Sequence, residues 1–86
     1  MRRIAVVCGE KEFENFKSVQ PSGRRNRDGA WYNEETDTEY IHAYDFERVA
    51  GLVLDGVIGH GPFEAVDKKL LDLVRSRVRP HHLRQP

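Results

Sequence analysis

The stretch IAVVCGEKEF, Ile4 to Phe13, decides the fold of this chain. Its first half, Ile4 to Cys8, is apolar at every position, which is typical of a strand covered on both faces in a parallel sheet. From Glu10 onward the apolar residues Phe13, Phe16 and Val19 recur every three positions between polar and charged ones, which predicts an amphipathic helix that begins at Glu10 and ends before Pro21. A strand followed directly by a helix predicts an α/β fold with this strand at the centre of the sheet.

The middle of the chain predicts a loop and then two strand-forming stretches. The segment PSGRRNRDG, residues 21–29, consists of turn formers and polar residues without an apolar position, so we expect a loop there. Residues 30–33 and 39–44 are rich in β-forming types and are separated by a polar run, which suits either a hairpin or an extended loop leading into one strand.

The last part of the chain predicts a short helix, a strand and a longer helix. Asp45 is a natural N-cap for a helix that runs to about Leu52. The run LVLDGVIGHG, residues 52–61, supplies the last strand. An apolar stripe predicts the final helix from Phe63 to about Arg79, with Pro62 at its first helical position.

Together these elements predict one α/β domain over residues 1–80 and a flexible tail over residues 81–86. Right-handed crossovers would place the first strand between the other two. We therefore expect a small three-layer Rossmann-like or RecA-like domain with a three- to four-stranded, mainly parallel sheet. The pattern leaves open whether residues 30–33 join that sheet.

Composition bounds the classes of function. The chain has 86 residues, and its 14 Lys and Arg balance its 14 Asp and Glu, so it lacks the overall basic charge usual in nucleic-acid-binding proteins. The single cysteine, Cys8, has no partner for an internal disulfide, and the apolar run before Gly9 is too short to span a bilayer. We expect a cytoplasmic protein without a membrane contact.

The loops after the predicted strands are the first candidate ligand site, because ligands of open α/β sheets bind beyond the carboxyl ends of the strands. The residues there are Gly9, Gly59, His60 and Gly61. A phosphate-binding loop needs several glycines and usually a lysine, whereas Gly9 stands alone before Glu10 and other acidic residues. We expect no cofactor and no metal here, and a nucleotide-binding or enzymatic use of these loops is kept as an alternative.

The arginine-rich loop is the second candidate site. Basic and aromatic side chains follow one another there in a composition that could bind phosphates and stack a base: Arg24, Arg25, Arg27, Trp31 and Tyr32. The acidic run from Glu34 to Glu39 comes directly afterwards and would oppose a nucleic acid on the same face. A protein partner therefore fits better than DNA or RNA, and nucleic-acid binding by this loop is the second alternative.

The segment TEYIHAYDFERVAGLVLDGVIGHG, residues 38–61, carries a resemblance. Through Arg48, Gly51, Leu52 and the strand DGVI it resembles the core of RecA-like phage terminase and helicase ATPase domains, and more closely small uncharacterised proteins of actinobacterial phages. The phosphate-binding lysine of an ATPase is absent after Gly9. The resemblance implies a reduced RecA-like core that has lost ATP hydrolysis, and a bacterial host cytoplasm as its location.

We therefore expect a non-enzymatic accessory or interaction protein of phage type. Self-association as a homodimer is also expected, because a small sheet with two edges and a modest core gains from covering one surface with a second copy. Blocks of opposite charge would face each other across the two-fold axis, with Trp31, Tyr32 and Tyr40 at its aromatic centre.

Overall fold

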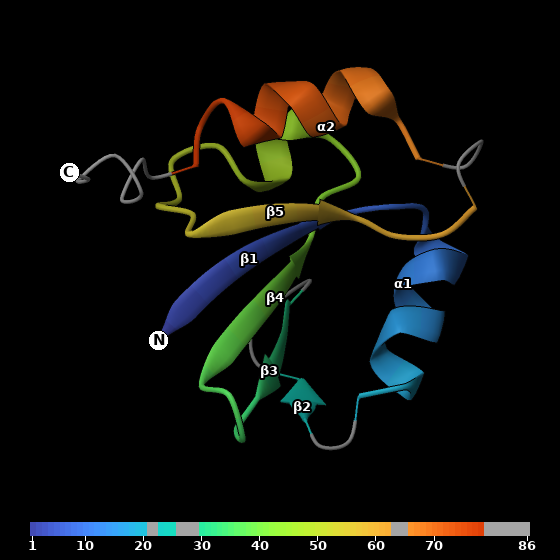
Figure 1. Cartoon of the computed structure of the whole chain (residues 1–86), viewed down its shortest axis with the longest axis vertical. Helices are drawn as coiled ribbons and strands as arrows, with labels where there is room; N and C mark the ends of the chain where they lie inside the picture. The colour runs from blue at the N-terminus through green and yellow to red at the C-terminus, as the bar shows by residue number, and fades with distance from the viewer. Residues whose placement is uncertain (21–22, 26–29, 63–65, 79–86) are drawn as a thin grey trace, which may run out of the picture.

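The computed structural model of this chain describes residues 1–20, 23–25, 30–62 and 66–78. Five strands form one mixed sheet in the order β2-β3-β4-β1-β5 (Figure 1). β1 is parallel to β4 and to β5, whereas β3 is antiparallel to β2 and to β4. The strands are β1 (Arg2–Val7), β2 (Arg24–Arg25), β3 (Ala30–Asn33), β4 (Thr38–His42) and β5 (Gly56–Gly59).

The prediction of a Rossmann-like or RecA-like, mainly parallel sheet of three to four strands is wrong. The α/β class holds and β1 lies between β4 and β5, but β2 and β3 add an antiparallel arm, so that β4 rather than β1 is the middle strand. The turn that joins β3 to β4 explains this, because four residues are too few for a parallel crossover. The carboxamide oxygen of Asn33 accepts hydrogen bonds from the backbone N–H of Glu35 at 2.9 Å and of Thr36 at 3.4 Å, which closes that turn.

Of the predicted helices, only the first has the expected position. α1 (Glu10–Ser18) begins directly after Gly9. The predicted short helix is a single 3-10 turn, η1 (Phe46–Arg48), although its N-cap is confirmed: an Asp45 oxygen accepts from the Arg48 N–H at 3.0 Å.

The final helix, α2 (Lys68–Arg75), is shorter than predicted. It begins after Asp67, whose carboxylate accepts from the Leu70 N–H at 3.0 Å and so caps the helix. Pro62 lies outside it, and Phe63 lies outside the described residues. Val78 leaves the helical stripe to form a parallel bridge with Leu54, which ends α2 early.

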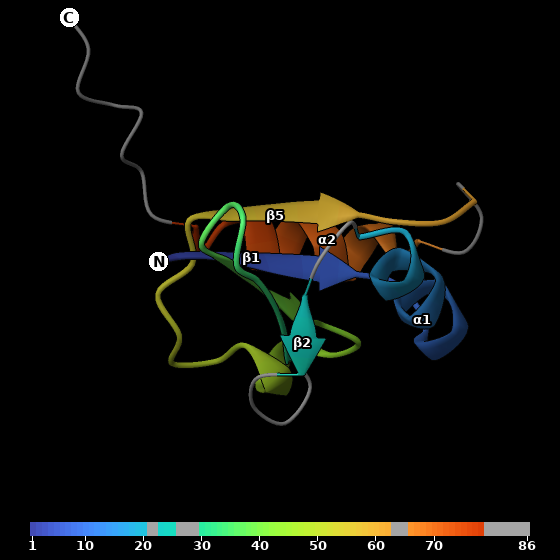
Figure 2. The same ribbon diagram turned by 90° about the horizontal axis from the view of Figure 1, so that it is seen from below.

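Each face of the sheet has its own apolar core. On one face Phe13 and Phe16 of α1 pack on Val6 and Cys8. On the other face α2 and the segment after η1 cover a larger core that includes the fully buried Leu54 and Val74. In both ribbon views α2 runs beside β5, while α1 lies at the end of the sheet toward which β1 points (Figure 2).

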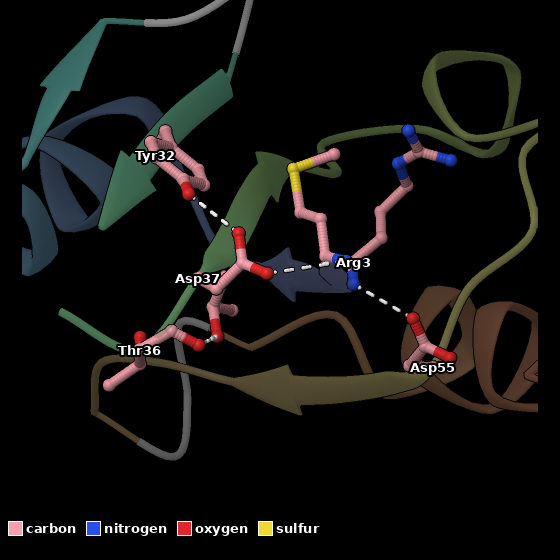
Figure 3. Close-up of polar contacts among 7 residues, drawn as sticks. Arg3, Tyr32, Thr36, Asp37 and Asp55 are labelled. Atoms are coloured by element: carbon pink, nitrogen blue, oxygen red, sulfur yellow. Dashed lines mark hydrogen bonds and ion pairs between the residues drawn. The ribbon is translucent and has the colours of Figure 1, made fainter. Parts of the chain in front are cut away.

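The opposite end of the sheet, where β1 and β4 begin, is closed by polar contacts (Figure 3). The Tyr32 hydroxyl donates to Asp37 at 2.6 Å, and the Arg3 backbone N–H donates to Asp55 at 2.9 Å. The Arg3 guanidinium Nε lies 2.9 Å from a carboxylate oxygen of Glu39, whose residue is 0% exposed. A buried ion pair therefore joins β1 to β4 at this end.

Candidate anion-binding cleft

A cleft of about 630 Å³ opens at the carboxyl ends of β1 and β4. This volume suits a small ligand or one unit of a polymer, and the location is where open α/β sheets bind ligands. α1 forms one wall, and the arm of β2 and β3 and the segment after β4 form the others. The lining residues are Glu10, Lys11, Phe13, Glu14, Lys17, Arg25, Ala30, His42, Tyr44 and Arg48.

His42 forms a rigid part of the cleft wall. Its ring is buried and stacks on Phe13, with the centroids 4.7 Å apart and the planes 7° from parallel. Its Nε2 lies 2.8 Å from the carbonyl oxygen of Cys8. Because a carbonyl oxygen only accepts, Nε2 must carry the proton, and that nitrogen is committed to holding the end of β4 to the segment that follows β1.

Tyr44 and Arg48 form a stacked pair at the mouth of the cleft. Tyr44 is 48% exposed, and the Arg48 guanidinium carbon lies 4.6 Å from the centre of its ring. Arg48 also donates a hydrogen bond to the Tyr44 hydroxyl. The cap made by Asp45 sets the turn that brings Arg48 back over the ring four residues before it. A cation is thereby held close to an exposed aromatic ring.

The lining carries an excess of positive charge. Among the described residues that line the cleft, the four cations Lys11, Lys17, Arg25 and Arg48 outnumber the two carboxylates Glu10 and Glu14 by two. One of the four is partly neutralised, because the Lys17 ammonium lies 2.9 Å from Glu14 and over the rings of Phe13 and Trp31. Within the described ranges, Lys11 and Arg25 have no carboxylate partner. The cleft therefore favours an anionic ligand.

The residues predicted for the arginine-rich loop do not share one surface. Arg24 pairs with Tyr32 and Arg25 with Trp31 across β2 and β3, so the two arginines point to opposite faces of the sheet. On one face Arg24 lies 5.2 Å from the Tyr32 ring centre, and on the other Arg25 lines the cleft. Arg27 lies outside the described residues.

Trp31 is not available to stack a base. It packs against the core under α1, and its indole Nε1 is buried with no hydrogen-bond partner among the residues that the structure describes. The chain passes close over the ring, because a Cβ at Gly23 would lie 2.1 Å from Nε1. Of the five residues predicted for this site, Arg25 alone lies in the cleft as the structure describes it.

The other predicted site, formed by Gly9, Gly59, His60 and Gly61, is divided: Gly59 and Gly61 line a second cleft of about 360 Å³, whereas the space between Gly9 and Gly61 is occupied. A Cβ at Gly9 would lie 2.5 Å from the Glu12 carboxylate, and a Cβ at Gly61 would lie 2.8 Å from the Glu12 Cγ. The carboxylate of Glu12 thus lies between the two loops, where a phosphate group would need to enter. The His60 ring packs with its edge toward Phe16, with 5.3 Å between the centroids.

The acidic run predicted to oppose nucleic acids lies far from the cleft. Residues 34–37 form the turn before β4, and Thr38 pairs with Arg2 at the beginning of β1. The cleft lies beyond the other end of β4, at His42. Part of the negative charge is also paired, since Arg24 Nε lies 3.4 Å from a Glu34 oxygen. The acidic turn therefore does not face the cleft.

Sequence reasoning missed most of the cleft: Lys11, Lys17, His42, Tyr44 and Arg48. Tyr44 and Arg48 lie four positions apart on either side of the recognised cap Asp45, which was the available indication that their side chains could meet. The other three come from helix α1 and strand β4, and the pattern of each segment alone does not show that they meet.

The described ranges hold neither a metal-binding cluster nor a membrane-spanning helix. They contain no group of three or more His, Cys, Asp or Glu residues arranged to hold a metal ion. None of their helices is long and apolar enough to cross a lipid bilayer. Compared with known proteins, the chain matches no protein family, no curated protein and no solved structure.

Proposed function

We propose that this chain is a non-enzymatic interaction protein that binds an anionic segment of its partner in the cleft between α1 and the end of β4. The observation that carries the proposal is the convergence of Lys11 from α1, Arg25 from β2 and the Arg48–Tyr44 pair on one cleft. Three separate segments supply these groups, and among the described lining residues the cations outnumber the carboxylates by two.

The surroundings of the two most reactive side chains near the cleft support a role without catalysis. Burial, with a smaller contribution from the Glu12 carboxylate, raises the pKa of the Cys8 thiol to about 11. The thiol therefore stays protonated near neutral pH and is a poor nucleophile. The Nε2–H of His42 is bonded to a backbone carbonyl, so this nitrogen does not serve as a base.

The accessory role in a phage and the bacterial host cytoplasm remain predictions that rest on the resemblance of residues 38–61. Homodimer formation also remains a prediction, but its proposed centre needs revision. Trp31 and Tyr40 point to the α1 face of the sheet, whereas Tyr32 points to the other face. These rings do not form one aromatic surface.

The binding of simple polyanions tests the proposed function. We expect tripolyphosphate and poly-L-glutamate to shift the backbone amide NMR signals of residues around the cleft, above all Lys11, Arg25 and Tyr44, with effects that weaken as salt is added. The signals of the acidic turn at residues 34–37 should not move. No shifts with either polyanion, or shifts spread evenly over the chain, would contradict the proposal.

A further inference from the structure

Building on the proposed function, we infer that the anionic partner is a single-stranded nucleic acid, with a base stacked on the Arg48–Tyr44 pair and its phosphates held by Lys11 and Arg25. The stacked pair is the first support. The exposed Tyr44 ring and the Arg48 guanidinium, whose carbon lies 4.6 Å from the ring centre, offer two planar groups at the mouth of the cleft. Such planes bind the faces of unpaired bases, and every base has such a face.

The spacing of the positive charges is the second support. Lys11 and Arg25 project from different elements, α1 and β2, rather than converging on one point with backbone N–H groups. Isolated cations suit phosphodiesters, which carry one charge each. A free nucleoside triphosphate needs a loop that gathers several charges, and the space between Gly9 and Gly61 is occupied by Glu12. A strand of nucleotides therefore fits better than a free nucleotide.

The lining argues against an acidic peptide as the occupant. Protein interfaces draw most of their binding energy from apolar and aromatic anchors in desolvated pockets. The apolar residues that line this cleft, Phe13 and Ala30, are each 5% exposed and are already covered by the domain itself. The exposed groups of the cleft are charged side chains and the ring of Tyr44. Cations can bind the phosphates of a single strand, and a ring can stack on its bases.

Fluorescence anisotropy of the full chain with labelled dT12 and rU12 tests this inference, with poly-L-glutamate as competitor. We expect saturable binding of the oligonucleotides. With two to three phosphates contacted, affinity should fall by about tenfold between 50 and 200 mM salt, since the logarithmic slope is about −0.7 for each phosphate. Poly-L-glutamate should compete only at about tenfold higher concentration or above.

The neighbouring arginines of β2 provide a matched pair of variants. Arg25→Gln should weaken binding several-fold and reduce the salt slope by about 0.7. Arg24→Gln removes the same charge from the other face of the sheet and should change affinity less than about twofold. Tyr44→Leu should weaken binding by about tenfold through lost stacking, whereas Tyr44→Phe, which keeps the ring, should retain most of it. Circular dichroism before and after heating checks that each variant is folded.

The outcomes separate this inference from the proposed function. If poly-L-glutamate binds in the cleft and the oligonucleotides do not, the partner is an acidic protein segment, and the nucleic-acid inference is overturned while the proposed function stands. If Arg24→Gln and Arg25→Gln weaken oligonucleotide binding equally, or folded Tyr44→Leu binds normally, the inference is overturned as well. If no polyanion binds, both are wrong.

Discussion

Replacing Glu39 by alanine should destabilise this domain far more than removing any exposed carboxylate. Glu39 lies on β4 with 0% of its surface exposed, and its carboxylate accepts from Arg3 Nε at 2.9 Å. The Arg3 side chain is 22% exposed, so it is largely enclosed as well. In Glu39→Ala the guanidinium would lose this acceptor while remaining mostly out of water.

The size of the effect follows from this burial. Removing one partner of a buried ion pair costs about 3–5 kcal/mol, against about 0–1 kcal/mol for an exposed pair. Water reaches part of the Arg3 guanidinium, so we expect the lower end, about 3 kcal/mol. At about 0.05–0.15 kcal/mol per residue, a domain of 86 residues has a free energy of unfolding of about 4–13 kcal/mol. Glu39→Ala should therefore remove a large part of the stability.

Urea unfolding followed by the fluorescence of Trp31, the single tryptophan, measures the loss. Glu39→Gln keeps an acceptor for Arg3 and should cost only about 1 kcal/mol. The matched control is Glu34→Ala, because Glu34 pairs with Arg24 on the solvent-exposed surface. This substitution should change the free energy of unfolding by less than about 0.5 kcal/mol. A double-mutant cycle with Arg3→Ala should give a coupling of about 1–3 kcal/mol. A cost for Glu39→Ala below about 1 kcal/mol, or a coupling near zero, would refute the reasoning.

Three other predictions concern the thiol, the tyrosine contact and the oligomeric state. Burial, and to a smaller extent Glu12, raises the pKa of the Cys8 thiol to about 11. A disulfide reagent at pH 8 should therefore react much more slowly with the folded chain than with the chain unfolded in urea. Equal rates would contradict this prediction. The hydrogen bond to Asp37 raises the pKa of Tyr32 and lowers that of Asp37. Their contact should therefore stabilise the fold between the unfolded-state pKa values of the two groups. It is lost as the pH falls through the folded pKa of Asp37 or rises through that of Tyr32. In urea unfolding followed from acid to alkaline pH, Tyr32→Phe should remove the alkaline dependence and reduce the acid one, because the Met1 amino group also lowers the pKa of Asp37. Light scattering should give twice the chain mass of 10.0 kDa, decreasing with salt, and a mass of 10.0 kDa in low and high salt alike would exclude the homodimer.

The parts of the fold that were predicted correctly are those determined by local patterns. The continuous apolar run of β1 and the three-residue spacing of Phe13 and Phe16 in α1 each identify their own element. The antiparallel arm could not be found in this way. Arg24 and Arg25 have no β-forming pattern of their own, and they join the sheet because β3 offers them a free edge.

The cleft was harder to predict, for a related reason. Composition placed Arg24, Arg25, Trp31 and Tyr32 in one site because they are close in sequence. Alternation along the strands separates them instead, so that Arg24 and Tyr32 share one face and Arg25 and Trp31 the other. Once Arg24 and Arg25 are known to lie in a strand, this separation follows, because successive side chains of a strand point to opposite faces of the sheet. A loop, which was predicted there, has no such alternation.

The place of β1 between β4 and β5 also has a consequence for how the chain folds. β1 is synthesised first, yet its neighbours in the sheet, β4 and β5, lie at residues 38–42 and 56–59. The hairpin of β3 and β4 needs only its own short turn, so it can form early and locally. We expect β1 to dock onto that hairpin afterwards, and the free edge of β1 to be the last gap in the sheet to close. During synthesis one edge of the most apolar segment of the chain would thus stay unpaired until β5 has emerged from the ribosome.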